Sequence, residues 1–579
     1  QAFAGVTRLD GTGTYTRCGT FRSLPGATLT FGAGTHRFGD GSVFDLSGTL
    51  VNNGQFSLVG QNSGLTVATG SMLDLGVANF AGNGVLTNQG TVSADGVAFS
   101  GRLINAGTAN LRNGTSLASG FYNTGDLNIV SGTVTALGAT SELAGGTINL
   151  GSGATLEKSG GTLLWSGGTF GGSGTLAFTN GGLIGFSGNG DRILDNANLS
   201  FSFTNLSLPS GSLRLQSGNL SFNTTAGNST LIPVGTELTM AGGTLTNNGP
   251  LDVSGLFGLY GGTLAGAGAI NMTGGTIDLP ANSTVNWTAT GAMSNSGTLN
   301  LSNRTITNAI TNNGTINTTG GLVFTQLFTN QGTFNLNSGT TTFSAGFTQN
   351  AGSTRLGTGA GTSANVVAGG SGFNVAGGTL SGSGNLAGDL NVGNGIVSVG
   401  FSPGSLNITG NLNLSAGSTT NIELGGTAPG TGYDTIAVSG TANLAGALNV
   451  TSYGGYVPAA GSSYNFMSFG SSTGAFGSTN LPAGWAMSMN SASTYLQLLM
   501  AAAQAAGVSP LQALMQALAA ASGSAGSMAS DPGATTMGGT SLDFSRVTPN
   551  DLATSLMQQV VGVTQVLPST DFEDLKVCQ

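Results

Sequence analysis

The stretches LTNQGTV at Leu86–Val92, LINAGTA at Leu103–Ala109 and FYNTGDL at Phe121–Leu127 are three copies of one phrase. Each copy has an apolar residue, any residue, then asparagine, and a glycine two positions after the asparagine. Successive asparagines in these copies are 17 and 18 positions apart. The phrase returns along the chain, and its central residues are Asn52, Asn88, Asn105, Asn123, Asn247, Asn295, Asn312 and Asn330. Such a repeat predicts a structure of stacked, similar units.

A period near 18 residues is too short for a repeat of two helices and is typical of one coil of a parallel β-helix. Within a unit such as Thr333–Leu336, apolar residues alternate with Thr and Asn, as in a strand with one face inside. A single coil cannot bury its apolar face alone, but stacked coils share one core. The sequence therefore predicts an all-β fold, a right-handed parallel β-helix with about 18 residues per coil.

The recurrent asparagine has two structural interpretations. Its amide can bond the equivalent amide one coil above and below, which forms a ladder. Alternatively, asparagine can adopt a left-handed conformation at a coil corner, as the glycine two residues later does more easily. A ligand site would be singular, whereas stacking requires repetition at every coil. We expect a ladder or corner role, with Asn88, Asn105 and Asn123 one above another, and likewise the group from Asn295 to Asn330.

The composition excludes several classes of protein. Charged residues make up 6% of the chain, against about 25% in a typical soluble domain. The chain has 103 glycines, yet 39% of its residues are hydrophobic, which a disordered chain lacks. Glycine follows no strict triplet and there are only 13 prolines, so the chain is not collagen. The net charge is −9 and no cluster of Lys and Arg occurs, so we expect no nucleic-acid binding.

The sequence divides into four predicted segments. Residues 1–41 contain four of the 13 basic residues and are expected to form an N-terminal β cap. Residues 42–399 carry the β-helix repeats, residues 400–500 form a terminal β-helix segment, and residues 501–579 form a helical tail with a Gly/Ser-rich connector.

In the tail, Ser509-Pro510 and Thr548-Pro549 are typical starts of helices. No run reaches the roughly 20 apolar residues that a membrane span needs. The chain begins with Gln1 rather than methionine, and we expect that a secretion signal has been removed.

Residues 400–500 resemble a known family of exoproteins. GFSPGSL at Gly400–Leu406, GYDTI at Gly432–Ile436 and VSGTANLAGALNV at Val438–Val450 are similar to the terminal passenger segment of autotransporters and filamentous-haemagglutinin-like adhesins. The resemblance implies a secreted bacterial β-helix, at the cell surface or extracellular, that serves as an adhesin or a component of a biofilm matrix.

Catalytic chemistry is not evident in the residues. Asp191 and Asp195 flank Arg192, but residues four apart in a strand lie about 13 Å apart, too wide for a glycosidase pair. Coil stacking could bring Glu142 near Glu157, which keeps a polysaccharide lyase or hydrolase as an alternative. The sole histidine, His36, has no nucleophile motif nearby, and we expect it to be structural. We expect no enzyme activity, no cofactor and no metal site.

The predicted function is mechanical: an extracellular, rod-like surface or matrix fibre whose copies join end to end. A monomeric adhesin that binds a host or matrix glycan is the first alternative, and the enzyme is the second. Cys18 and Cys578 lie near opposite ends of the chain and are disulfide candidates. In a long rod a bond between neighbouring subunits needs no return of the tail, and two unpaired thiols remain the other possibility.

Overall fold

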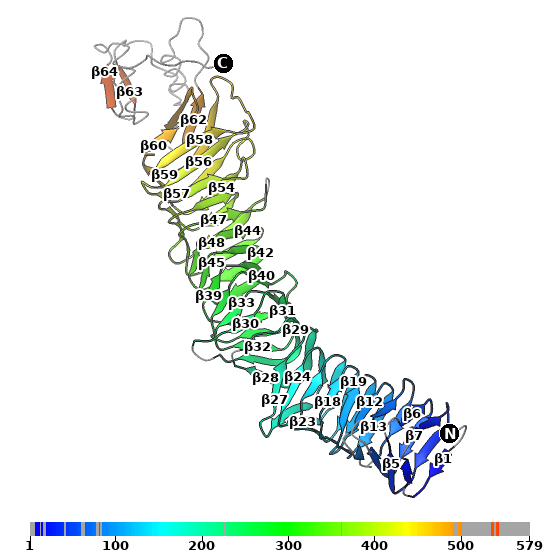
Figure 1. Ribbon diagram of the computed structural model, residues 1–579. Coiled ribbons are helices and arrows are strands. Elements are labelled where there is room, and N and C mark those ends of the chain that lie inside the picture. Colours follow the sequence, from blue (N-terminus) through cyan, green and yellow to red (C-terminus); the bar gives the residue numbers. More distant parts are fainter. Residues whose placement is uncertain are drawn as a thin grey trace, which may run out of the picture. The chain divides into compact units, whose positions relative to one another are not determined.

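The computed structural model describes residues 6–500, with gaps at 12, 16–18, 40–41, 59–63, 77–79, 82–83, 205, 225–226, 360–361 and 490–494, together with 534–537 and 540–543. Every secondary-structure element in these residues is a strand. The fold is an all-β parallel β-solenoid, as the repeat predicts (Figure 1). The chain forms two compact units, residues 1–310 and 311–579.

The first unit begins with three parallel sheets, in which each strand pairs with the strand three positions later in the chain. The pairs at its start are β1 (Val6–Leu9) with β4 (Thr28–Phe31), β2 (Gly13–Tyr15) with β5 (Thr35–Phe38), and β3 (Thr20–Ser23) with β6 (Val43–Leu46). Two of the sheets contain nine strands each and end at β26 (Thr175–Thr179) and β27 (Leu183–Phe186). Three successive strands therefore make one turn of the solenoid.

A column of apolar side chains shows how the turns share a core. Leu50, Leu73 and Val92 occupy the same register position in successive turns, and each is 0% exposed. The column continues through Ala109, Leu127, Ile148 and Phe170. Removing such side chains from water is the main stabilising contribution, and each turn buries its apolar face only because a neighbour covers it.

The length of a turn varies. Thr91 is in register with Thr108, 17 positions later, whereas Thr49 is in register with Met72, 23 positions later. In the second unit Ala447 and Ser478 are partners 31 positions apart. The predicted length of about 18 residues applies around the closely spaced asparagine phrases and is too short elsewhere. The added residues fall between strands and also at irregularities within them, such as the register shift between Leu111 and Arg112.

The organisation of the first unit changes after β27. β28 (Arg192–Phe203) and β29 (Gly211–Phe222) are 12 residues long each and pair in parallel with shifts of register. β29 then pairs with both β31 (Thr236–Met240) and β32 (Thr244–Asn247). The single strand β29 therefore occupies positions that two separate strands, β31 and β32, occupy in the next turn.

The second unit continues the parallel pattern around an aromatic core. Phe328, Phe347 and Phe373 share one register position, with ring centroids 5.5 and 4.2 Å apart. The parallel stacking ends at β62 (Tyr495–Met500), which is antiparallel to both β59 (Ser463–Gly474) and β61 (Trp485–Met489).

The predicted end segments have different outcomes. The strands of residues 6–38 already stack on the strands of the next turn, and a distinct N-terminal cap is not confirmed. The helices predicted from Ser509 and Thr548 lie outside the described residues. In the described part of the tail, β63 (Ala534–Met537) and β64 (Thr540–Asp543) form an antiparallel hairpin. The described residues contain no helix that is long and apolar enough to cross a membrane.

Candidate functional site

The eight asparagines of the repeated phrase are all fully buried. Asn88, Asn105 and Asn123 share one register position in successive turns. Nδ2 of Asn88 donates to Oδ1 of Asn105 at 2.6 Å, and Nδ2 of Asn105 donates to Oδ1 of Asn123 at 2.7 Å. In the second unit, Nδ2 of Asn312 donates to Oδ1 of Asn330 at 2.7 Å. The structure therefore joins these five residues in side-chain ladders.

Asn52, Asn247 and Asn295 also bond to backbone atoms. Nδ2 of Asn52 donates to the carbonyl oxygen of Gly54 at 2.8 Å, and Nδ2 of Asn247 donates to a carbonyl oxygen of the next turn at 3.0 Å. Oδ1 of Asn295 accepts the backbone N–H of Gly297 at 3.1 Å. Side-chain ladders thus occur in the chain, whereas the predicted left-handed conformation is wrong for all eight asparagines, none of which is among the described residues with positive φ.

The glycine of the phrase has a different role from the predicted one. Gly90, Gly107 and Gly125 are not among the described glycines with positive φ, so the expected left-handed conformation is wrong at these positions. A Cβ on Gly107 would lie 2.1 Å from the carbonyl oxygen of Gly90 in the preceding turn. Glycine is needed here because two turns pack backbone against backbone.

A second kind of ladder lies on the outside of the second unit, and the sequence reasoning missed it. Asn374, Asn391, Asn413 and Asn443, the first outer ladder, are half-buried. Nδ2 of Asn391, Asn413 and Asn443 donates to Oδ1 of the ladder asparagine one turn earlier, at 2.9, 2.7 and 2.5 Å respectively. The signal was present in the stretches FNV, LNV and LNL, where asparagine separates two buried apolar residues.

Another face of the same turns carries the second outer ladder, Asn365, Asn385 and Asn407. Nδ2 of Asn385 donates to Oδ1 of Asn365 at 2.7 Å, and Nδ2 of Asn407 donates to Oδ1 of Asn385 at 2.8 Å. These side chains are exposed. The two outer ladders therefore offer the same chemistry in different surroundings.

A groove of about 310 Å³ follows the first outer ladder. It is lined by Asn374, Asn391 and Asn413 together with the small residues Ala376, Gly393 and Ser415. The two remaining lining residues are Val392 and Leu414, so no charged side chain lines the groove. Its polar groups are amides, hydroxyls and backbone atoms.

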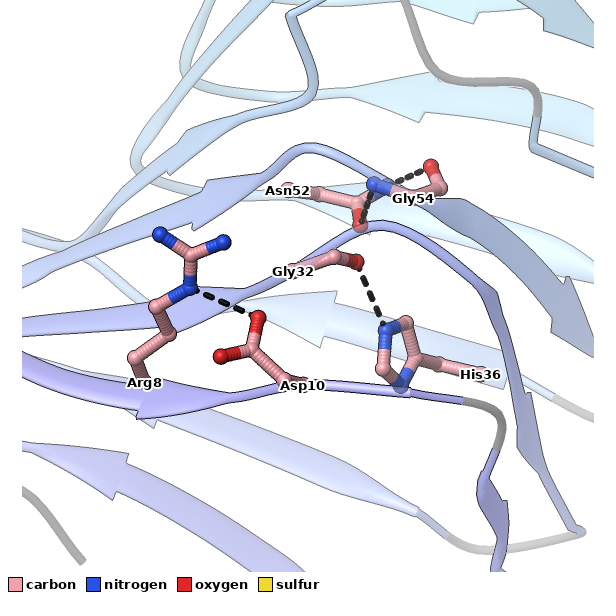
Figure 2. A network of polar contacts seen from close by, with 6 residues as sticks. All are labelled: Arg8, Asp10, Gly32, His36, Asn52 and Gly54. Carbon is pink, nitrogen blue, oxygen red and sulfur yellow. Dashed lines mark hydrogen bonds and ion pairs between the residues drawn. The ribbon is translucent and has the colours of Figure 1, made fainter.

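His36 is a core residue, as expected. Its side chain is 1% exposed, and its Nε2 lies 3.0 Å from the carbonyl oxygen of Gly32 (Figure 2). Its ring contacts Phe31 edge-on, with centroids 4.9 Å apart. The nearby ion pair of Arg8 with Asp10 is exposed. These contacts with described residues fit a packing role for His36.

The carboxylates considered for catalysis are not brought together by stacking. Glu142 lies in β21 (Ser141–Leu143) and Glu157 in β23 (Thr155–Ser159), and the two strands belong to different sheets. Stacking therefore does not unite this pair, contrary to the alternative left open by the sequence. The side chains of Asp191 and Asp195 are exposed and accept hydrogen bonds from serine hydroxyls of the next turn, at 2.7 and 3.1 Å. Among the residues that the structure describes, no three His, Cys, Asp or Glu form a group that could hold a metal ion.

In the part of the chain that the structure describes, Arg192 and Asp434 are, besides Lys158, charged residues buried away from the ladders. Arg192 is 1% exposed and donates to five backbone carbonyl oxygens, and burial lowers its pKa. Asp434 is 1% exposed, and burial raises its pKa to about 7. Both side chains bond mainly to backbone, which indicates that they hold loops in place. Cys18 and Cys578 lie outside the described residues.

No protein-family model matches the chain, and no curated protein matches it either.

Proposed function

We propose that the chain is an extracellular structural protein, secreted by a bacterium, that forms a rod-like fibre at the cell surface or in a matrix. Its coil is right-handed in this proposal, and it performs no catalysis. The resemblance of residues 400–500 to autotransporter passengers and filamentous-haemagglutinin-like adhesins supports a location outside the cell.

The observation that carries the proposal is the ladder of Asn88, Asn105 and Asn123. Backbone hydrogen bonds already join successive turns, and the ladder adds side-chain bonds of 2.6 and 2.7 Å within the core. A buried polar group that lacks a partner is costly, so sliding or separation of adjacent turns would break several bonds together. Such a stack suits a protein that bears load.

End-to-end association is the second part of the proposal. In the described part of the chain, β1 and β2 each pair on one side only, with β4 and β5. A strand edge with free N–H and C=O groups accepts another strand. A neighbouring copy supplies that strand in the proposed fibre, with a Cys18–Cys578 disulfide between copies as an additional link.

The test is negative-stain electron microscopy of the purified full-length chain over a dilution series, with sedimentation velocity on the same samples. We expect filaments that lengthen with concentration, and multimers on non-reducing electrophoresis that collapse to monomer on reduction. Single particles at every concentration would exclude the fibre. Filaments that persist in the Cys18→Ser, Cys578→Ser double variant would retain the fibre and exclude the disulfide link.

A further inference from the structure

We propose that the groove beside the first outer ladder binds a neutral, linear polysaccharide. The inference does not depend on end-to-end association, because it concerns one face of the second unit. It begins with the hydrogen-bonding capacity that the ladder leaves unused.

A primary amide has two N–H donors and an oxygen with two lone pairs. Asn391 donates once, to Asn374, and accepts once, from Asn413. Asn413 likewise donates to Asn391 and accepts from Asn443. Each of these two half-buried amides therefore keeps one N–H and one lone pair for another partner. A sugar hydroxyl is both a donor and an acceptor, so it can satisfy both groups.

The spacing of these amides favours a polymer. Adjacent strands of a sheet are about 4.8 Å apart, and the ladder repeats the same donor and acceptor at that interval. A ligand that presents equivalent hydroxyls at regular intervals can bond to successive turns together, and its affinity then rises with chain length.

The residues around the first outer ladder argue against a nucleic acid, an acidic glycan or an extended peptide as the ligand. No charged side chain lines the groove, so a nucleic acid or an acidic glycan would find no counter-charge there. An extended peptide is usually recognised at a free strand edge, whereas the strands that carry these asparagines pair on both sides. Ala376, Gly393 and Ser415 in the lining are small, and the volume of about 310 Å³ leaves room for a sugar ring.

The second outer ladder supplies a matched control. Asn385 and Asn391 are both middle members of an outer asparagine ladder, and both accept one and donate one side-chain bond. Only Asn391 lines the groove. Replacing either by alanine removes the same ladder bonds, but only Asn391→Ala changes the proposed binding surface.

The experiment measures binding of the full-length chain to soluble neutral glucans and mannans of increasing length, with heparin as a polyanion control. We expect affinity for at least one neutral glycan to rise with its length, Asn391→Ala to weaken it about tenfold or more, and Asn385→Ala to leave it unchanged. Ala376→Leu enlarges a lining side chain of the groove but leaves the asparagines of the ladder unchanged, so it should also weaken binding while the unfolding midpoint stays the same. The proposal is overturned if no neutral glycan binds, if heparin binds best, or if the two alanine variants weaken binding equally.

Discussion

Oδ1 of Asp434 accepts the backbone N–H of Gly404 at 2.7 Å, across 30 positions of the chain. Oδ2 of the same carboxylate accepts the backbone N–H of Glu423, also at 2.7 Å. Gly404 precedes β54 (Ser405–Thr409), and Glu423 lies in β56 (Thr419–Leu424). One buried side chain therefore fixes two segments against the start of β57 (Thr435–Leu444). It belongs to the Tyr433-Asp434 motif on which the family resemblance rests.

The stability of the chain should fall as this carboxyl ionises. Burial raises the pKa of Asp434 from its ordinary 3.8 to about 7, so the folded state keeps the proton over a range where the unfolded state has lost it. The contribution of Asp434 to the free energy of unfolding is fully present below about pH 4. It is lost as the pH rises to about 7, which lowers the free energy of unfolding by up to about 4 kcal/mol. Urea unfolding of the full chain at about pH 4.5 and about pH 8 measures it.

Asp434→Asn is the matching variant, because its amide does not ionise. The decline in stability between the two pH values should be smaller in this variant than in the unchanged chain. An equal decline in both proteins would assign the pH dependence to other groups.

The fold was largely predictable because its signal is repeated. Val92, Ala109 and Leu127 of the apolar column each lie four positions after the asparagine of a phrase, so strand, face and stacking of these turns follow from one alignment of the copies. Turn length was less predictable, because insertions such as those between Ala447 and Ser478 fall in loops that carry no periodic signal.

The outer features could not be predicted as well. The first outer ladder has asparagines between apolar residues, as in LNV and LNL, but any solvent-facing strand position allows this pattern, so it is not specific enough to predict a bond between Asn391 and Asn413. The buried positions of Arg192 and Asp434 depend on loop carbonyls and N–H groups distant in sequence, such as that of Gly404. Single residues of this kind have no repeat to identify them.

Asn105→Ala should destabilise the first unit more than an equivalent change on the surface. The variant leaves Asn88 and Asn123 each without a ladder partner in the core, and we expect a loss of about 2–4 kcal/mol. Asn110→Ala is the control: half-buried Asn110 accepts one outer ladder bond from Asn128, and its loss should cost about 1 kcal/mol or less. Urea unfolding followed by circular dichroism compares the two, and equal losses would contradict a special role for the buried ladder.

Gly107→Ala tests the close approach of two turns. The new Cβ would lie 2.1 Å from the carbonyl oxygen of Gly90, which is backbone and cannot rotate away, so we expect a loss of about 1–3 kcal/mol. Gly64→Ala is the control, because its nearest atom is the carbonyl oxygen of Val85 at 3.8 Å and its φ is not positive. That change should be neutral. Thermal unfolding measures the stability of both variants. If Gly107→Ala leaves the unfolding temperature unchanged, the steric explanation is wrong.

Substitutions of Arg192 test whether the stability of the turns on either side of β27 depends on one buried cation. Its guanidinium donates to the carbonyl oxygens of Trp165, Ser187, Gly188, Gly190 and Ser210, which belong to the turns on either side of this change. Arg192→Met leaves these carbonyl oxygens without that donor, and we expect a loss of about 3 kcal/mol or more. Arg192→Lys should recover little of the lost stability, because one ammonium group cannot reproduce the planar fork of donors.

Arg214→Met is the control, because it changes an exposed arginine of the next turn and should cost little stability. Urea unfolding followed by tryptophan fluorescence is suited to the comparison, since Trp165 is buried against this site. An Arg192→Met chain as stable as the Arg214→Met chain would show that packing alone holds the two kinds of turn together.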